Sequence, residues 1–297
     1  MGFKELIGNE KIKENLTKVL NKNTTSHSYM FIGTKGIGKK LFAKEFAKGI
    51  LCTNQESKPC GTCKSCIEFI SQNNPDYYDI KVKEEENSIK IETIRQMQSK
   101  VQELPIVSER KVYIIDDSEL MTKEAQNCLL KTLEEPPEFV TIILIVSNEN
   151  LILNTIKSRC IKIYFNDITD KELRSYINEK LAETQFSENM ISACNGSIGK
   201  AINISENKEI YLELDEIFTK IENYTLTDVI SKLDILYKNK DEIQEILEYL
   251  NTIFIKKAKE DIKYIDYIEY IEETKRNINA NCNYDMSIDS LIFKIFE

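Results

Sequence analysis

Four cysteines that stand close together carry the clearest metal-binding signal in this chain. They are Cys52, Cys60, Cys63 and Cys66, and they fall around a turn at Pro59 and Gly61. Zinc prefers four tetrahedral ligands, and closely spaced thiolates can enclose one ion from a tight turn. A site of four thiolates has no open position, which is typical of structural zinc. An iron–sulfur cluster accepts the same ligands, but no nearby pattern indicates electron transfer. The spacing therefore predicts a structural zinc site.

A second chemical signal is the segment Gly33-Thr34-Lys35-Gly36-Ile37-Gly38-Lys39-Lys40, which follows an apolar run and opens a predicted helix. This is the Walker A layout, in which backbone N–H groups and a helix N-terminus hold phosphates. Lys39 matches the phosphate-binding lysine and, with Gly33 and Gly38, forms a candidate ATP-binding loop. The next position should carry Ser or Thr to bind magnesium. It is Lys40, and an ammonium group has no lone pair for a cation.

The run Lys111-Val112-Tyr113-Ile114-Ile115-Asp116-Asp117 is a buried strand that ends in two acids, the Walker B pattern. Asp116 matches the metal-coordinating acid. The next position is normally a Glu that orients water, and Asp117 is one methylene shorter. Together, Lys40 and Asp117 predict that hydrolysis is inefficient. Two interpretations follow: the loop is retained for the stability of the fold, or it holds ATP without turnover.

The elements that must position these groups alternate between strand-like and helical patterns. The predicted strands are 29–32, 112–115 and 141–146, and the predicted helices are 40–50, 91–102 and 123–134. Such alternation is typical of an α/β fold, in which helices cover a parallel sheet.

The last third of the chain is predicted to be a helix bundle. All five prolines lie at or before Pro137, and the last glycine is Gly199, so neither helix breaker follows. Apolar residues recur there at helical spacing. They are Leu214, Ile217, Phe218 and Ile221, and then Ile243, Ile246, Leu247, Leu250, Ile253 and Phe254.

Between the two halves, Thr169-Asp170-Lys171-Glu172 has capping-box spacing and predicts the start of a helix. These patterns together predict three domains. Residues 1–166 would form the P-loop domain with the cysteine module at about 52–66, residues 167–205 a small helical domain, and residues 206–297 a helical C-terminal domain.

Composition limits the class of protein. Of 297 residues, 41% are hydrophobic and 30% are charged, which is typical of a globular chain. No apolar run reaches about eighteen residues and the N-terminus lacks a signal-peptide core, so we expect no membrane span and a cytoplasmic location. A net charge of −9 argues against binding nucleic acid by bulk phosphate neutralisation. Four scattered cysteines, Cys128, Cys160, Cys194 and Cys282, are expected to be buried apolar residues.

A longer set of strings resembles a known family. The strings are Leu129-Leu130-Lys131-Thr132-Leu133-Glu134-Glu135-Pro136-Pro137, then Ile145-Val146-Ser147-Asn148 and Ile156-Lys157-Ser158-Arg159-Cys160. With Phe3-Lys4-Glu5-Leu6-Ile7-Gly8-Asn9 and Ser26-His27-Ser28-Tyr29, they resemble the AAA+ subunits of bacterial DNA polymerase III clamp loaders over residues 1 to about 205. The resemblance implies an AAA+ domain with an inserted zinc module, a helical lid and an all-α collar domain.

Three departures indicate which branch of that family the chain resembles. A gamma/tau motor subunit keeps Ser or Thr after the loop lysine, Glu after the strand-end Asp, and an arginine in a Gly-Ser-x-Arg stretch. Here these positions are Lys40, Asp117 and Gly199. The chain therefore resembles the delta prime subunits, which do not hydrolyse ATP.

The resemblance also implies a role for Arg159, which in this family is presented to ATP bound by a neighbouring subunit as an arginine finger. Spacing alone would predict only a surface ion pair at a helix end. Ser147 and Asn148 match the position called sensor 1, with a structural role expected here. The implied partners are the gamma/tau and delta subunits of a five-membered ring and, indirectly, the sliding clamp and primer-template DNA.

Two other functions are open on sequence grounds. One is an ATP-hydrolysing motor of the gamma/tau kind, against which Lys40 and Asp117 argue. The other is a stand-alone zinc-dependent module that binds nucleic acid, against which the acidic net charge argues.

Overall fold

The computed structural model describes residues 3–55, 57–83, 86–229 and 232–296. The chain divides into two compact units, Met1–Glu172 and Leu173–Glu297. Helix α7 (Asp170–Lys180) begins in the first unit and continues into the second. Within the described ranges, every helix is too short or too polar to span a lipid bilayer.

The described part of the first unit is built on a five-stranded parallel sheet in the order β2-β3-β4-β1-β5. The strands are β1 (Ser28–Ile32), β2 (Tyr77–Ile80), β3 (Lys111–Ile115), β4 (Val140–Val146) and β5 (Ile161–Tyr164). Strands β1, β3 and β4 are buried along their whole length, whereas β2 and β5 are partly exposed at the edges. The predicted α/β fold with a parallel sheet is confirmed. The three central strands each begin one residue earlier than predicted, and the edge strands were not predicted.

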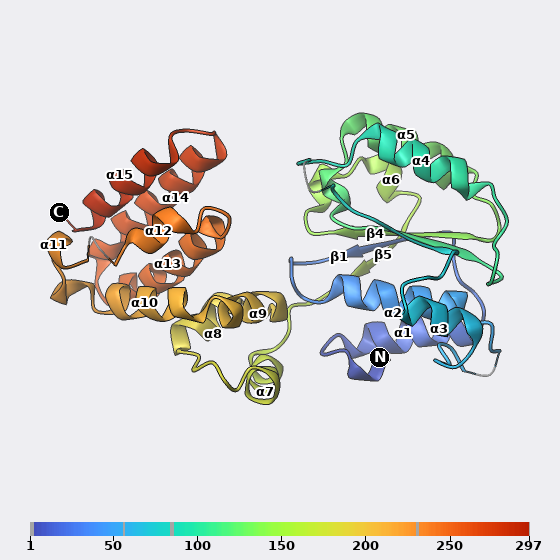
Figure 1. Ribbon diagram of the computed structural model, residues 1–297, viewed down its shortest axis with the longest axis horizontal. Helices are drawn as coiled ribbons and strands as arrows, with labels where there is room; N and C mark the ends of the chain where they lie inside the picture. The colour runs from blue at the N-terminus through green and yellow to red at the C-terminus, as the bar shows by residue number, and fades with distance from the viewer. Residues whose placement is uncertain (1–2, 56, 84–85, 230–231, 297) are drawn as a thin grey trace. The chain divides into compact units, whose positions relative to one another are not determined.

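Helices cover both faces of this sheet (Figure 1). On one side lie α1, α2 and α3, and on the other α4, α5 and α6. Their bounds are α1 (Glu10–Asn21), α2 (Lys39–Leu51), α3 (Lys64–Ile70), α4 (Ile91–Val101), α5 (Lys123–Glu134) and α6 (Asn154–Lys157). The three helices predicted in this region correspond to α2, α4 and α5.

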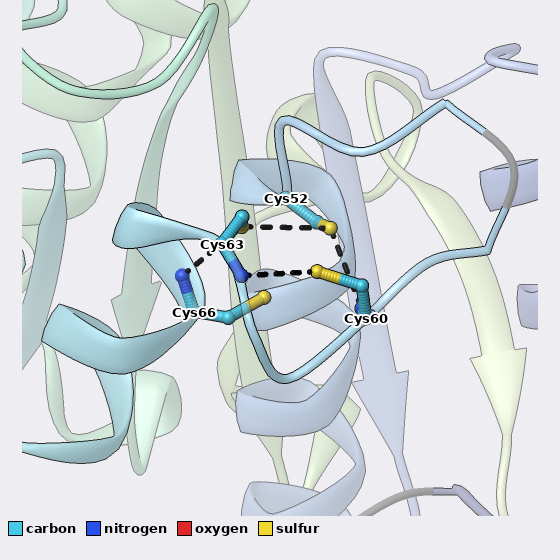
Figure 2. Close-up of side chains that lie close together, drawn as sticks. All are labelled: Cys52, Cys60, Cys63 and Cys66. Atoms are coloured by element: carbon cyan, nitrogen blue, oxygen red, sulfur yellow. Dashed lines mark hydrogen bonds between the residues drawn. The ribbon is translucent and has the colours of Figure 1, made fainter.

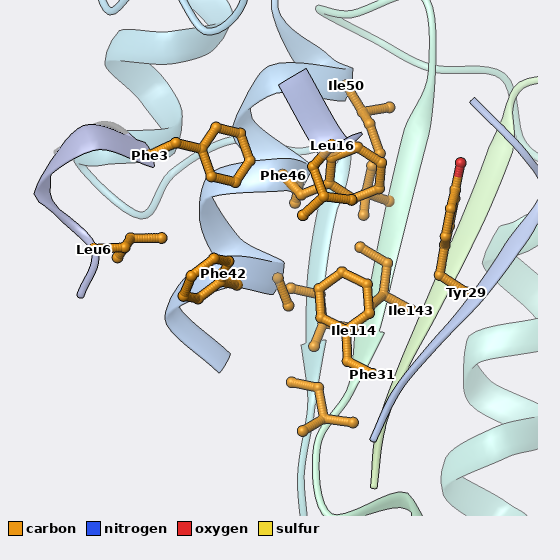
Figure 3. Packing of buried hydrophobic residues seen from close by; sticks show 14 of the residues in the cluster. Phe3, Leu6, Leu16, Tyr29, Phe31, Phe42, Phe46, Ile50, Ile114 and Ile143 are labelled. Carbon is orange, nitrogen blue, oxygen red and sulfur yellow. The ribbon is translucent and has the colours of Figure 1, made fainter. Parts of the chain in front are cut away.

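Successive side chains along each strand point to opposite faces of the sheet, so each strand contributes to both helix layers. Phe31, Ile114 and Ile143 face the α1–α2 side, where they pack with Phe42 and Phe46 of α2 (Figure 3). Their immediate neighbours in the strands pack against α4 and α5 instead; these include Met30, Ile32, Tyr113, Ile115, Ile142 and Leu144. Burial on both faces explains why the central strands read as continuous apolar runs.

The sheet brings three strand ends to one edge. Strand β1 ends at Ile32 before the glycine loop, β3 ends at Ile115 before Asp116, and β4 ends at Val146 before Ser147. Because β3, β4 and β1 are parallel neighbours, their carboxyl ends meet there.

All secondary structure in the described part of the second unit is helical, as predicted. Its helices after α7 are α8 (Glu188–Cys194), α9 (Ile198–Glu206), α10 (Lys208–Thr219), α11 (Leu226–Val229), α12 (Asp234–Lys238), α13 (Ile243–Ala258), α14 (Ile265–Asn279) and α15 (Tyr284–Phe296). Every residue of the two predicted apolar stripes is buried, and α13 packs against α8, α10 and α14.

The capping box predicted ahead of α7 is confirmed. The Thr169 N–H donates to Glu172 Oε2 at 3.0 Å, and the Glu172 N–H donates to Thr169 Oγ1 at 3.3 Å. The prediction for the scattered cysteines is correct for Cys194, which is buried, and only partly correct for Cys128 and Cys160, which are half-buried against the core. It is wrong for Cys282, which is exposed because it lies in the connection between α14 and α15.

Candidate functional site

The glycine loop connects β1 to α2 and depends on its glycines for shape. A Cβ on Gly33 would lie 2.8 Å from Ile37 Cδ1 and 2.9 Å from the Phe165 carbonyl oxygen, so no larger residue fits. Gly38 caps the N-terminus of α2 with φ +94°, in the left-handed region that favours glycine. The loop therefore presents a helix N-terminus at the strand-end edge, as predicted.

The Lys39 side chain is folded into this loop and is 4% exposed. Its ammonium group donates to the Gly33 carbonyl at 2.6 Å, to the Thr34 carbonyl at 2.8 Å and to Ser147 Oγ at 3.1 Å. Burial lowers the pKa of Lys39 below its ordinary value, although the nearby acids Glu119 and Asp117 oppose this shift. Lys39, the first residue of α2, and Ser147, which directly follows β4, are thus in direct contact.

The Lys40 side chain points toward the acids of the neighbouring strand ends. Its Nζ lies 2.8 Å from Asp116 Oδ2 and 3.4 Å from Asp79 Oδ2. Burial would lower the pKa of Lys40, but the hydrogen bond to Asp116 and the charges of both acids outweigh it and raise the pKa above the ordinary value. Lys40 is therefore a charged ammonium group that neutralises the carboxylate matching a metal ligand.

Two acids at this edge were missed by the sequence analysis. Asp79 belongs to β2, an edge strand whose mixed residues Tyr-Tyr-Asp-Ile gave no continuous apolar signal. Glu119 lies in the short 3₁₀ helix Ser118–Leu120, and its Oε1 accepts from the Ser147 N–H at 2.9 Å. Its Oε2 is buried without a hydrogen-bond partner among the described residues. No sequence pattern separates Glu119 from an ordinary acid at the start of a helix.

Asp117 has φ 44° and ψ 50°, in the left-handed region, and its N–H donates to Asp116 Oδ1 at 3.2 Å. The predicted loop residues Gly33, Gly38 and Lys39 therefore do meet Asp116 at one edge of the sheet, and Lys40 joins them. The cysteine cluster and Arg159 lie elsewhere.

The four cysteines come together at the far end of α2 (Figure 2). Their sulfur atoms all lie within 4.8 Å of one another, and Cys52 Sγ and Cys63 Sγ are 3.9 Å apart. Four sulfur atoms held about 2.3 Å from a tetrahedral zinc ion would lie about 3.8 Å apart. Since α2 has 13 residues, the cluster is about 20 Å along the helix axis from the glycine loop.

Local structure favours negative charge on two of these sulfur atoms, those of Cys60 and Cys63, because burial is outweighed by hydrogen bonds, which lower the pKa of both thiols. The N–H groups of Cys60, Cys63 and Cys66 donate to the sulfur atoms of Cys52, Cys60 and Cys63, respectively, at 3.3–3.4 Å. Burial raises the pKa of Cys60, but hydrogen bonds from Thr62 and Cys63 outweigh it and lower the pKa to about 6. Burial raises the pKa of Cys66. A metal must displace the remaining thiol protons, and the four cysteines could bind a metal ion such as zinc.

Arg159 lies at the edge of the sheet where the strands begin. The Ser28 hydroxyl donates to the Arg159 carbonyl at 2.5 Å, and β5 starts two residues later with Ile161 beside Tyr29. The glycine loop follows the opposite end of β1. Five residues of strand separate the two edges by roughly 16 Å, so Arg159 is remote from the loop of its own chain.

The Arg159 guanidinium group makes two contacts within the chain. Nη2 lies 2.7 Å from Glu134 Oε1, and Nη1 donates to the Thr155 carbonyl at 2.8 Å. The side chain remains 35% exposed. The surface ion pair that spacing alone predicts is therefore present, and its partner is the first Glu of the Leu-Glu-Glu-Pro-Pro string.

Comparison with known proteins identifies similar sequences. Residues 8–169, more than half of the chain, match the model of the family described as DNA polymerase III, delta subunit. The chain is 31% identical over 211 residues to DNA polymerase III subunit tau/gamma of Haemophilus influenzae, covering 69% of this chain and 30% of that protein. It is 30% identical over 276 residues to DNA polymerase III subunit tau of Bacillus subtilis, covering 89% and 48%, respectively. The chain spans less than half the length of either relative.

One solved structure shares the fold at low sequence identity. It is a DNA polymerase III gamma subunit-related protein from Thermotoga maritima, with a TM-score of 0.54 and 17% identity, covering 95% of this chain and 97% of that one. The matched range 8–169 contains the glycine loop, the cysteine cluster and Arg159. On this match, the chain belongs to the family described as DNA polymerase III, delta subunit.

Proposed function

We propose that this chain is a non-hydrolysing subunit of the delta prime kind in a bacterial clamp loader. It would assemble with gamma/tau and delta subunits in the cytoplasm and present Arg159 to ATP bound by a neighbouring subunit. The assembly would load the sliding clamp onto primed DNA. The family match and the similarity to subunits named tau/gamma support a role within DNA polymerase III.

The observation that carries the non-hydrolysing assignment is the contact between Lys40 and Asp116. A nucleotide site of this kind needs Mg²⁺ to neutralise and orient the phosphates. The Lys40 Nζ lies 2.8 Å from the carboxylate that would hold that ion, and it carries its own positive charge. A magnesium ion would have to displace Lys40 from Asp116 and would gain no hydroxyl ligand in exchange.

The position of Arg159 supports action on a second subunit. The side chain is partly exposed and lies at the opposite edge of the sheet from the glycine loop of its own chain. An arginine supplied in trans stabilises charge on the transferred phosphoryl group and accelerates hydrolysis by roughly 10³–10⁵-fold in other systems. A remote, exposed arginine can reach a nucleotide only in another molecule.

We propose further that the cysteine cluster binds one structural zinc ion. Cys52 directly follows α2, Cys63 caps the N-terminus of α3, and Cys66 lies in the first turn of α3, so one ion would link the two helices. All four ligands come from the protein, which leaves no open position for chemistry. The three-domain division at 166/167 and 205/206 is part of the same proposal, with residues 206–297 as the collar domain.

The test is reconstitution with candidate gamma/tau and delta subunits. The isolated chain should show no ATP turnover, whereas adding it should raise the ATPase rate of the complex. Arg159→Ala should lower that rate by at least tenfold without preventing assembly. Arg95→Ala is the matched control, because Arg95 is exposed on α4 of the same unit. A wild-type rate with Arg159→Ala would refute the proposal.

The second candidate is an ATP-hydrolysing motor of the gamma/tau kind, which the names of the similar proteins favour. It requires the isolated chain to turn over ATP. An ATPase rate that disappears in Lys39→Ala would establish it in place of the first proposal.

A further inference from the structure

The main chain around Arg159 is fixed more firmly than an exposed loop. The Arg159 N–H donates to the Ile156 carbonyl at 3.0 Å, and its carbonyl accepts from the Ser28 hydroxyl at 2.5 Å. These bonds join the residue to α6 on one side and to the start of β1 on the other. The base of the side chain is therefore held by the sheet, and only the long, flexible part of the side chain is left to be oriented.

Glu134 contacts this flexible part of the side chain. Its carboxylate and the Thr155 carbonyl hold the two terminal nitrogens of the Arg159 guanidinium group, using two of its five N–H donors. Hydrogen bonds between ionised partners are shorter and stronger than neutral ones. The remaining donors belong to a side chain that is 35% exposed, so they are available to a second molecule.

The place of Glu134 in its helix indicates that the helix itself does not require this acid. Glu134 is the last residue of α5, and Pro136 and Pro137 follow one residue later. A negative charge at the C-terminal end of a helix is unfavourable, because the helix dipole is already negative there. Glu135 shares this location but has no described ion pair. Of these two acids, Glu134 is the one that has an ion pair among the described residues, with Arg159.

We propose that Glu134 is the positioning residue for Arg159, and that it orients the guanidinium group toward the phosphates of a nucleotide in a neighbouring subunit. This inference rests on the proposed function. Orienting a charged group before the reaction removes the cost of ordering it in the transition state. Glu134 touches neither nucleotide nor water in this role and acts only through Arg159.

The experiment compares Glu134→Ala, Glu134→Gln, Arg159→Ala and the double variant Glu134→Ala/Arg159→Ala in the reconstituted complex. Glu135→Ala is the matched control, one residue away on the same helix end. We expect Glu134→Ala to lower kcat roughly three- to tenfold while KM for ATP changes less than about twofold. Glu134→Gln should recover part of that loss, because its amide oxygen still accepts from Arg159. Glu135→Ala should match the wild type.

The double variant separates positioning from a structural role. If Glu134 acts only through Arg159, the double variant should have the same kcat as Arg159→Ala. A further fall in the double variant would overturn the inference. So would wild-type kcat in Glu134→Ala while Arg159→Ala is impaired, and in that case the proposed function stands. If Arg159→Ala itself has wild-type kcat, both the positioning role of Glu134 and the proposed function are refuted. Gel filtration verifies that each variant assembles, and thermal unfolding verifies that it is folded. If Glu134→Ala does not fold, Glu134→Gln takes its place in the comparison.

Discussion

The Lys40 Nζ lies 2.8 Å from Asp116 Oδ2, so that a residue in the first turn of α2 and the residue directly after β3 form an ion pair beside the glycine loop. Asp79 Oδ2 lies 3.4 Å from the same ammonium group. A second ammonium group, that of Lys44, lies 3.8 Å from Asp79 Oδ2, so the two acids face two positive charges that the chain itself supplies. A site of this composition does not need a metal ion to be electrically balanced.

Replacing Lys40 with threonine should therefore create magnesium-dependent nucleotide binding. The variant restores a hydroxyl at the position after Lys39 and frees Asp116 for a cation. We expect ATP to bind at least about tenfold more tightly to Lys40→Thr than to the wild type in Mg²⁺, and the gain to vanish in EDTA. Titration with a fluorescent ATP analogue measures both.

Lys44→Thr is the control. Lys44 lies one helical turn after Lys40 in α2, and its Nζ is 3.8 Å from Asp79 Oδ2. Equal gains in both lysine variants would mean that lower positive charge, and not the freed Asp116, is responsible. Unchanged binding by Lys40→Thr would contradict the assignment of Lys40 as the obstacle to metal binding.

Asp76 should be a major source of stability in the first unit. Its carboxylate is fully buried and accepts from the backbone N–H groups of Ile106, Val107 and Ser108 at 2.7–2.8 Å. Asp76→Asn removes the charge and turns an amide NH₂ toward N–H donors. We expect a loss of roughly 2–4 kcal/mol in the free energy of unfolding of this unit.

Denaturant unfolding followed by circular dichroism measures this loss. Glu138→Gln is the control, since Glu138 is exposed in the connection between α5 and β4. A change below about 0.5 kcal/mol for Asp76→Asn, the size typical of surface substitutions, would show that the buried carboxylate is not needed.

Removal of metal should loosen the cysteine module. We expect protein purified without chelator to contain close to one equivalent of zinc, and Cys66→Ser to lose most of it because three thiolates leave the tetrahedron open. Thermal unfolding should shift to lower temperature in the variant and in chelator-treated wild type. Elemental analysis and a thermal melt provide the two measurements.

Cys282→Ser is the matched control, because Cys282 is exposed and lies outside the cluster. Less than half an equivalent of zinc in the wild type would contradict the proposed metal site. Iron in its place would favour the iron–sulfur alternative.

Acid should destabilise the second unit through Glu222. A hydrogen bond from Tyr264, together with Lys257, outweighs a small effect of burial and lowers the pKa of Glu222 to about 2. Because the pKa is lower in the folded state than in the unfolded state, the stabilisation is complete above about pH 4.5 and is lost as pH falls toward 2. Glu222→Gln should remove this part of the pH dependence.

Denaturant midpoints of the second unit between pH 6 and pH 2 measure the effect. Glu260→Gln, a change at an exposed acid in the same unit, should keep the wild-type pH profile. An identical profile for Glu222→Gln would show that its hydrogen bond with Tyr264 does not form in solution.

Local sequence patterns predict much of the fold. The strands β1, β3 and β4 are continuous apolar runs because both their faces are buried, and α13 has a regular apolar stripe because one face is buried. The edge strands β2 and β5 escaped prediction because their partly exposed residues are mixed in polarity. Asp79 was missed with β2.

The sequence by itself determined the residue types at the candidate sites: the four cysteines, the glycine loop, and the departures at Lys40 and Asp117. Only the tertiary structure decided which of these side chains meet. Lys40 contacts Asp116 because β1 and β3 flank β4 in one parallel sheet, and Glu134 contacts Arg159 because α5 ends at the edge where β5 begins. Such pairs join residues 76 and 25 positions apart, and no local pattern encodes a contact made through space.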